Sequence, residues 1–276
     1  MKNKNLKDLK IGIMGLGMIG GALKRYFDKV GYKVFFYDNG KNKGSTEEVN
    51  QADIIFICVP TPFDKEKGFD LSYVEDACSS ISGNKTIVIK STVLLGTTEK
   101  FQQKYPQHKF LFNPEFLIEE KADECMENPD RQIVGYTDSS RESAEKVLSI
   151  LPKAPFEKII RATEAEMVKY FGNTFLSTKV IFGNQMYDLC KAVGIDYDEV
   201  RECASMDKRI GPSHLNIYYG DYRGYGKKCL PKDIKALIQF ADEQGVDLKI
   251  HKVVEEINNK LMKDQGIDDP EKFSKR

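Results

Sequence analysis

Lys10-Ile-Gly-Ile-Met-Gly15-Leu-Gly17-Met-Ile-Gly20 is the stretch that decides the fold. Its first part, Lys10–Met14, is apolar and predicts a short β-strand that ends at the first glycine. From Met18 onward the apolar residues recur with helical spacing, and this helix is expected to stop at Gly31. Three glycines between a strand and a helix are typical of dinucleotide binding. They allow a tight turn, a close approach of the pyrophosphate and close helix–strand packing.

Asp38 strengthens this interpretation because it closes the next predicted strand, 18 residues after Gly20. At that place an acidic side chain binds the ribose hydroxyls of adenosine and repels a 2′-phosphate. The sequence therefore predicts a site for NAD rather than NADP, with the pyrophosphate at the helix N-terminus.

The following part of the chain alternates strand and helix patterns with short connections. Such repetition predicts an α/β fold with a doubly wound, Rossmann-type parallel sheet, which we place in an NAD-binding domain at 1–161. The expected strands are 53–59, 86–90, 109–112, 132–135 and 157–160, and the expected helices are 71–81, 97–104 and 140–151.

Residues 162–264 are expected to form an all-helical domain. Thr163-Glu-Ala-Glu166 has the pattern of a capping box, and it opens a helix that runs to about Val193 and is closed by Gly194. A helix of roughly 45 Å usually runs through a domain boundary or an oligomer interface. Further helices are expected from 196, at 233–244 and at 249–263, before a charged tail at 265–276.

The composition excludes several classes of function. The 276 residues carry 42 acidic and 42 basic side chains, so no net charge attracts the chain to nucleic acid or to an anionic membrane. The six cysteines show no CxxC pair and no spacing typical of a metal site, which indicates a reduced protein. Since no apolar N-terminal segment and no membrane-length apolar run is visible, we expect a cytoplasmic protein without bound metal.

Gly224-Tyr-Gly-Lys-Lys-Cys229-Leu-Pro-Lys232-Asp233 contains the candidate nucleophile. Cys229 precedes a helical pattern and lies beside lysines, and both features should lower the pKa of its thiol. A thiolate can attack a carbonyl. Together with a hydride acceptor, this suggests oxidation of an alcohol to an aldehyde, its capture by the thiol and a second oxidation to a thioester. Most free cysteines are simply buried apolar residues, but the Gly, Lys and Asp neighbours of Cys229 favour the nucleophile.

Other candidate residues are weak when taken singly. Lys169 and Asn173 lie four residues apart and share one helix face, where they could stabilise an alkoxide if Cys229 lies opposite. Without that partner, Lys169 would be a lysine that extends to solvent. Glu115 follows a predicted strand, as does Thr92, at the strand end where chemistry occurs in open α/β sheets. Arg209 could bind a phosphate, or it could be an ordinary surface arginine.

The chain resembles the UDP-glucose/GDP-mannose dehydrogenases, a family of nucleotide-sugar dehydrogenases. Seven segments over about residues 10–245 carry this resemblance, and the last of them is more similar to the UDP-glucose branch. They are Gly-Leu-Gly-Met-Ile-Gly (15–20), Cys-Val-Pro-Thr-Pro (58–62), Lys-Ser-Thr-Val (90–93), Asn-Pro-Glu-Phe-Leu-Ile-Glu (113–119), Glu-Met-Val-Lys-Tyr-Phe-Gly-Asn (166–173), Asp-Lys-Arg-Ile-Gly (207–211) and Gly-Tyr-Gly-Lys-Lys-Cys-Leu-Pro-Lys-Asp (224–233).

The resemblance implies an NAD-dependent enzyme that oxidises the C6 alcohol of a nucleotide sugar, UDP-glucose in particular, to a uronic acid and consumes two NAD⁺. Cys229 would form the thiohemiacetal and the thioester. Lys169, Asn173 and Asp233 would surround the reacting oxygen and a water, and Glu115 with Thr92 would manage the hydrolytic water. The family also implies a homodimer through the helix at 163–193, across which Arg209 would reach the neighbouring subunit's substrate.

The resemblance implies two further sets of residues. The cofactor would be bound by Gly15, Gly17, Met18, Ile19, Gly20, Asp38, Val59, Pro60, Thr61, Thr92 and Lys232. The substrate would be bound by Phe116, Leu117, Glu119, Arg209 and Gly226, with Phe116 and Leu117 as a backbone cradle for the phosphates.

The chain also departs from the family pattern. Relatives carry a further α/β unit that binds the uridine nucleotide, and this sequence is expected to lack it. Lys227 and Glu120 stand where relatives have glycine, and Lys227 is costly if its position requires a positive φ. Two alternatives therefore stay open: an NAD-binding partner or regulatory subunit without turnover, and the same chemistry on a smaller substrate. A β-hydroxyacid dehydrogenase has a similar layout but does not use the Cys-Leu-Pro-Lys-Asp loop.

Overall fold

The computed structural model describes residues 8–64 and 68–271. The chain divides into two compact units, Met1–Lys169 (unit 1) and Tyr170–Arg276 (unit 2). The division falls inside helix α7 (Ala162–Ala192) rather than at its start. The reason is that the first turns of α7, with Ala162 and Ala165, pack in the core of unit 1.

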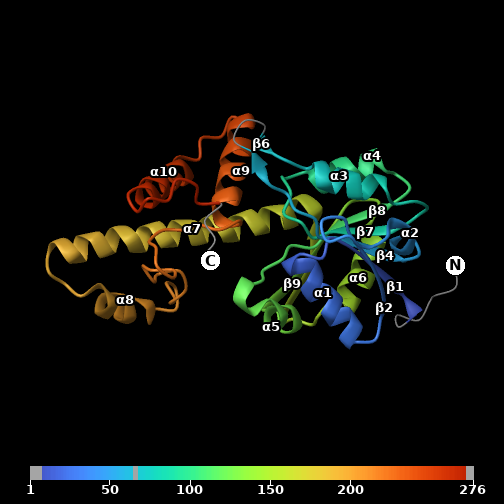
Figure 1. The fold of residues 1–276 in the computed structure, drawn as a ribbon, viewed down its shortest axis with the longest axis horizontal. Coiled ribbons are helices and arrows are strands. Elements are labelled where there is room, and N and C mark those ends of the chain that lie inside the picture. The colour runs from blue at the N-terminus through green and yellow to red at the C-terminus, as the bar shows by residue number, and fades with distance from the viewer. Residues whose placement is uncertain (1–7, 65–67, 272–276) are drawn as a thin grey trace. The chain divides into compact units, whose positions relative to one another are not determined.

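Unit 1 is built around one large sheet (Figure 1). Its strands lie in the order β10-β9-β8-β7-β4-β1-β2-β3. The strands are β1 (Lys10–Met14), β2 (Lys33–Asp38), β3 (Lys43–Gly44), β4 (Ile54–Ile57), β7 (Thr86–Ile89), β8 (Lys109–Phe112), β9 (Arg131–Tyr136) and β10 (Phe156–Arg161), while β5 (Phe63–Asp64) and β6 (Gly68–Phe69) form a separate hairpin.

The sheet is mostly parallel, as the Rossmann pattern predicts, but two pairs are antiparallel. β9 runs antiparallel to β8, with Phe112 opposite Gly135. The sheet expected to be parallel is therefore mixed at this strand. The connection after β8 holds only η2 (Glu119–Lys121) and α5 (Ala122–Glu127), and it returns to the same end of the sheet instead of crossing it. The short β3 also pairs antiparallel, with the end of β2.

Helices cover both faces of this sheet (Figure 1). One face packs against α2, α3, α4 and the start of α7 through residues such as Val49, Val74 and Phe101. The other face packs against α1, α5 and α6 through residues such as Leu23, Met126 and Val147. The helices are α1 (Met18–Lys29), α2 (Thr46–Val49), α3 (Ser72–Ser79), α4 (Thr97–Lys104), α5 and α6 (Arg141–Ile150).

The periodic segments of unit 1 were predictable, and the short ones were not. The predicted strands and helices are confirmed to within a few residues, although the strand expected at 53–59 is only Ile54–Ile57. The sequence pattern does not predict β3, β5, β6, α2, η2 or α5. Each has two to six residues, which is too short to show a hydrophobic period.

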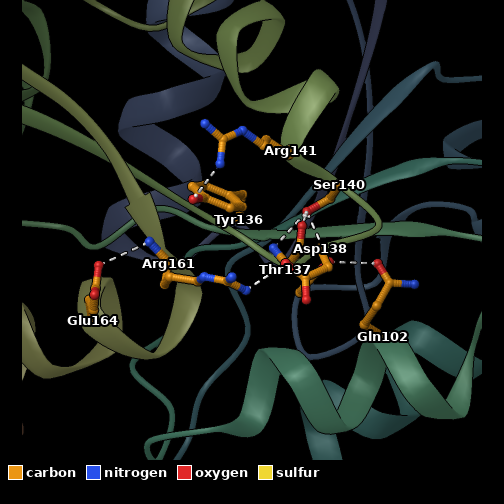
Figure 2. Close-up of polar contacts among 8 residues, drawn as sticks. All are labelled: Gln102, Tyr136, Thr137, Asp138, Ser140, Arg141, Arg161 and Glu164. Carbon is orange, nitrogen blue, oxygen red and sulfur yellow. Dashed lines mark hydrogen bonds and ion pairs between the residues drawn. The ribbon is translucent and has the colours of Figure 1, made fainter.

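The start of α7 differs from the predicted capping box. The helix begins at Ala162 directly after β10, and the side chain that reaches back is Glu164, whose Oε2 accepts a hydrogen bond from the backbone N–H of Arg161 at 3.1 Å (Figure 2). The guanidinium of Arg161 in turn contacts Asp138. Glu166 does not serve its own helix at all, because its carboxylate lies at the N-terminus of α4.

Unit 2 consists of the rest of α7 with α8 (Tyr197–Ser205), α9 (Leu230–Glu243) and α10 (Lys249–Lys263). Apolar residues of α7, α9 and α10 form its core, among them Ile181, Ile234 and Val254. No helix in the described ranges is both long and apolar enough to cross a membrane. The predicted charged tail lies partly outside the described residues, and its beginning is held by Gln265, which bonds the backbone of Arg223.

Candidate functional site

The three glycines of the turn between β1 and α1 have separate structural reasons. Gly15 has a φ of 89°, and a Cβ on it would lie 2.6 Å from the carbonyl oxygen of Cys58. A Cβ on Gly20 would lie only 1.9 Å from the carbonyl oxygen of Gly15, so Gly20 is required by packing. Gly17 is different, because its φ is ordinary and nothing lies within 4 Å of an added Cβ.

This open space is suited to a dinucleotide. Gly17 is the N-cap residue of α1, and no side chain caps the helix there. Backbone N–H groups at such a helix N-terminus bind phosphate oxygens. Met18 and Ile19 form the first turn of α1. The residues present therefore fit the pyrophosphate of NAD.

Asp38 lies beside this turn, as predicted. Its two carboxylate oxygens accept hydrogen bonds from the backbone N–H of Leu16 at 2.6 Å and of Lys41 at 2.8 Å. The end of β2 and the glycine turn are thus joined by a carboxylate, in the position where such a group binds ribose hydroxyls.

The segments after β4 and β7 also meet. The hydroxyl of Thr61 donates a hydrogen bond to the backbone carbonyl of Thr92 at 2.7 Å, and the hydroxyl of Ser91 donates to the carbonyl of Val59 at 2.6 Å. Pro60 lies on the same segment as Val59 and Thr61. Since these are neighbouring parallel strands, their carboxyl ends bring the predicted residues to one edge of the sheet.

Glu115 and Lys169 form a buried ion pair inside unit 1. The ammonium of Lys169 donates hydrogen bonds to Oε1 of Glu115 at 2.6 Å and to its backbone carbonyl at 2.9 Å, and both side chains are at most 7% exposed. Burial alone would raise the pKa of Glu115, but the Lys169 ammonium and the N–H of Leu117 hold it below its usual value. Glu115 is thus kept as a carboxylate.

Lys90 is a second buried lysine that the sequence analysis did not assign. Its ammonium donates a hydrogen bond to Oδ1 of Asn113 at 2.6 Å, and the amide of Asn113 donates to the carbonyl of Ile133 at 2.8 Å. Burial lowers the pKa of Lys90 to about 8. Lys90 therefore supports the segment that carries Glu115, and its presence in a Lys-Ser-Thr segment at a strand end was the available signal.

The segment after Glu115 was predicted to bind substrate. The Leu117 N–H donates to Oε2 of Glu115 at 2.9 Å, and the ring of Phe116 lies under the guanidinium of Arg131, 3.9 Å from the ring centroid. Glu119 and Glu120 are exposed at the start of the connection to α5. Glu120 therefore adds charge at the surface next to this segment.

Cys229 lies on the surface of unit 2, immediately before α9. Helix α9 begins at Leu230, earlier than the predicted 233, because Pro231 is well suited to a first turn. The backbone N–H of Asp233 donates to the carbonyl of Cys229 at 2.9 Å. The thiol is thus placed at the positive end of a helix, as the nucleophile interpretation requires.

Asp233 is buried one turn after Cys229. Its carboxylate accepts hydrogen bonds from the amide of Asn173 at 2.5 Å and from the ammonium of Lys232 at 2.6 Å. The structure therefore brings together Asn173, Lys232 and Asp233 in unit 2. Lys169, which was expected to share their site, pairs with Glu115 in unit 1.

The loop that leads to Cys229 is attached to α10 by Asn258, which the sequence analysis missed. The buried amide of Asn258 accepts from the N–H of Tyr225 at 2.8 Å and donates to the carbonyl of Tyr225 at 2.9 Å. A Cβ on Gly224 would lie 2.7 Å from Oδ1 of Asn258, and one on Gly226 would meet the carbonyl of Pro270 at 3.1 Å. The only feature of the sequence that could have indicated this contact is an asparagine among the apolar positions of an amphipathic helix.

Lys227 adopts a left-handed conformation with a φ of 63°. The position thus has the positive φ at which a lysine was expected to be costly. Glycine adopts this conformation without strain, whereas lysine is strained in it. Arg209, by contrast, is fully at the surface, and its guanidinium forms a two-pronged contact with Asp207, with Nη2 and Oδ2 2.6 Å apart.

Two segments of the chain match models of one protein family. Residues 40–151 match the NAD binding domain of the UDP-glucose/GDP-mannose dehydrogenase family, and residues 163–260 match its central domain. Between them the two matches span most of the chain.

Individual proteins show the same similarity. The UDP-glucose 6-dehydrogenase of Pseudomonas aeruginosa is 37% identical over 77% of this chain and 49% of its own length, and UDP-glucose 6-dehydrogenase TuaD of Bacillus subtilis is 36% identical over 77% and 47%. A UDP-glucose dehydrogenase structure from Pyrobaculum islandicum aligns with a TM-score of 0.83 and 28% identity, covering 96% of this chain and 73% of that one. The chain spans about half the length of the curated relatives it matches.

Two alanine substitutions separate cofactor binding from packing in the glycine turn. Gly17→Ala should leave the melting temperature within about 2 °C of wild type, but it should weaken NADH binding at least about tenfold by filling the space for the pyrophosphate. Gly20→Ala should lower the melting temperature by about 5 °C or more, because of the overlap with Gly15. Calorimetry and titration by NADH fluorescence measure the two effects. Wild-type binding by Gly17→Ala would show that the cofactor does not approach Gly17.

Replacing Lys227 by glycine should stabilise the protein. Glycine removes roughly 1–2 kcal/mol of strain from the left-handed conformation of the folded state. It also increases the conformational entropy of the unfolded chain, which offsets part of this gain. We therefore expect the free energy of unfolding to rise by up to about 1 kcal/mol. Denaturant unfolding measures it. The matched control is Lys228→Gly, next in the chain and outside the left-handed region, which should be destabilising. Equal losses for both variants would contradict strain at Lys227.

Proposed function

Because the chain belongs to the UDP-glucose/GDP-mannose dehydrogenase family, we propose that it is an NAD-dependent dehydrogenase that oxidises the C6 alcohol of a nucleotide sugar to the carboxylic acid. UDP-glucose is the first candidate substrate, since several similar proteins are UDP-glucose 6-dehydrogenases. NAD⁺, when bound, accepts a hydride in each of two oxidations.

The observation that carries this proposal is the position of Cys229. An exposed cysteine at the N-terminus of α9, one turn from a buried carboxylate, combines access for a substrate with a local field that favours the thiolate. A cysteine with only a packing role would be buried, as Cys78 is.

Cys229 is the proposed nucleophile. Its thiolate adds to the carbonyl carbon of the aldehyde that the first oxidation leaves, and the carbonyl oxygen takes up the electron pair. The thiohemiacetal alkoxide formed in this way would lose a hydride from the same carbon, and its oxygen would re-form the carbonyl group of a thioester. Asn173 and Asp233 are proposed to hold the reacting oxygen and a water, because the amide and the carboxylate are already paired in unit 2.

Hydrolysis of the thioester requires a group that accepts a proton from water. We assign this role to Glu115, which Lys169 and Leu117 keep ionised, with Thr92 as a hydrogen-bond partner for the water. Addition of the water to the thioester carbon then releases the Cys229 thiolate and the acid. Lys169 is also proposed to stabilise the alkoxide through its ammonium.

The proposal also assigns residues to the recognition of the nucleotide sugar. In unit 1 the backbone of Phe116 and Leu117, with Glu119, is assigned to the phosphates and sugar. In unit 2 the assigned residues are Gly226 and Arg209, and Lys232 is assigned to the cofactor. A planar guanidinium suits a phosphate, and the exposed Arg209 would exchange its present contact with Asp207 for that phosphate.

We further propose a homodimer that forms through α7. Its residues Phe171, Phe175, Phe182 and Leu189 are each more than half exposed. Their spacing of four, seven and seven residues places them on one stripe of the helix. A second copy of the same stripe is a self-complementary cover for such a surface. Arg209 is then assigned to the substrate of the neighbouring subunit.

Purified protein should reduce two NAD⁺ for each UDP-glucose converted to the acid, followed by NADH absorbance and by product analysis. Cys229→Ala should abolish product formation, because no thioester can form. The matched control is Cys203→Ala, since Cys203 is the other exposed cysteine of the described ranges, and its turnover should equal that of wild type.

The result that would count against the proposal is equally specific. Binding of NADH without turnover on a panel of UDP- and GDP-sugars would favour the alternative of a partner subunit. One NADH per sugar, unaffected by Cys229→Ala, would point to a simple alcohol dehydrogenase.

The dimer can be tested with one glutamate inside the exposed stripe of α7 and one outside it. Phe182→Glu should convert the protein to a monomer, because it buries an unpaired carboxylate in the interface. Lys191→Glu places a glutamate at an exposed position of α7 outside this stripe and should stay dimeric. Light scattering after size-exclusion chromatography measures the mass. A wild-type monomer at micromolar concentration, or a dimeric Phe182→Glu variant, would contradict this interface.

A further inference from the structure

Glu166 is a buried carboxylate that the proposed chemistry does not use. Its side chain has no exposed surface. Oε2 accepts a hydrogen bond from the N–H of Gly96 at 2.6 Å, and Oε1 accepts from the N–H and the hydroxyl of Thr98 at 2.9 and 2.7 Å. These donors form the N-terminus of α4, whose N-cap residue Gly96 has no side chain to cap it. A residue of α7 thus caps α4.

Only a carboxylate can satisfy this arrangement in full. Three donors point at two side-chain atoms, and an ionised carboxylate accepts at both, whereas glutamine would accept at one and turn an N–H₂ group toward the other donors. The arrangement has a cost, because burial raises the pKa of Glu166 to about 7. The bonds from Thr98 and Gly96 oppose that rise, and Glu99 of α4 is the charged group that adds to it.

The backbone N–H groups that bond Glu166 lie where the segment that carries Thr92 ends and α4 begins. This segment, 91–96, leaves β7 and leads into α4. Its start is held by Ser91, which bonds Val59, and by Thr61, which bonds the carbonyl of Thr92. Its end is held by Glu166.

The same turn of α7 holds the segment after β8. Lys169 follows Glu166 by three residues, so the two side chains leave one face of the helix. Lys169 bonds both the carbonyl and the carboxylate of Glu115. One turn of α7 is therefore fastened at once to the Thr92 segment and to the Glu115 segment.

We propose that Glu166 is a positioning residue that fixes the Thr92 segment in register with Lys169 and Glu115, so that the segments after β7 and β8 move only together. The importance of this register for catalysis rests on the proposed function. The coupling itself is a property of unit 1 and can be measured without turnover.

Hydrogen exchange of the intact protein tests the coupling. In Glu166→Gln the amides of 91–98 should exchange at least about tenfold faster, and so should those of 113–118, including the Leu117 N–H that bonds Glu115. Thr98→Val removes one donor and keeps the carboxylate, so it should produce a smaller effect of the same kind. It serves as the second variant if Glu166→Gln does not fold.

Ser140→Ala is the matched control. The buried Ser140 hydroxyl likewise accepts a hydrogen bond from a backbone N–H, that of Thr137 at 2.8 Å, but near the start of α6 (Figure 2). This variant should leave both segments at wild-type exchange rates. The proposal is overturned if Glu166→Gln accelerates only 96–98, or if Ser140→Ala accelerates both segments equally.

A kinetic measurement separates positioning from general stability. If wild type turns over a nucleotide sugar, Glu166→Gln should lower kcat at least about tenfold and leave KM for NAD within about twofold. Ser140→Ala should change neither. Unchanged kcat in Glu166→Gln would overturn the role in positioning. If wild type shows no turnover, the proposed function fails, while hydrogen exchange still decides the coupling.

Discussion

The buried ion pair between Lys169 and Glu115 is the interaction on which the rest of unit 1 depends. Removing one partner of such a pair leaves an unpaired charge and costs roughly 3–5 kcal/mol. The pair therefore joins the first turns of α7 to the segment after β8 within unit 1. A buried ion pair is rarely needed for stability alone, because apolar residues of similar size often stabilise the folded protein equally well or better. The proposed chemistry uses its ionised state, which the short distance between the two side chains maintains.

Residues with strong local constraints made the fold predictable. Gly15 and Gly20 stand where a Cβ would collide with backbone, and Asp38 closes a strand that pairs beside them. The sequence thus contained the α/β architecture, the glycine turn and the long helix, since each produces a periodic or a punctuated pattern within one short window. The exposed Cys229 before α9 was predictable for the same reason, although the helix begins three residues earlier than its pattern indicated.

Residues whose partners lie far along the chain were not predictable. Glu166 fits a local capping box by pattern, yet its donors are 68 and 70 residues away. Asn258 lies 33 residues from the loop that it holds. The reversal of β9 follows from a connection that stays at one edge of the sheet, which no strand pattern encodes. Glu166 and Asn258 each satisfy backbone groups that local structure leaves unsatisfied, and only the folded chain shows which ones.

The loop before Cys229 shows how strain and support are balanced within unit 2. Gly224 and Gly226 allow the loop to lie against α10, where Asn258 satisfies both polar groups of Tyr225. Lys227 then takes a left-handed conformation two residues before the thiol. A strained residue persists only where the surrounding structure fixes its backbone conformation. Here the contact of Tyr225 with Asn258 fixes the chain before Lys227, and the first turn of α9 fixes the chain after it. Lys227 lies between these two fixed parts of the chain. Its strain is therefore a consequence of the way in which Cys229 is held at the N-terminus of α9.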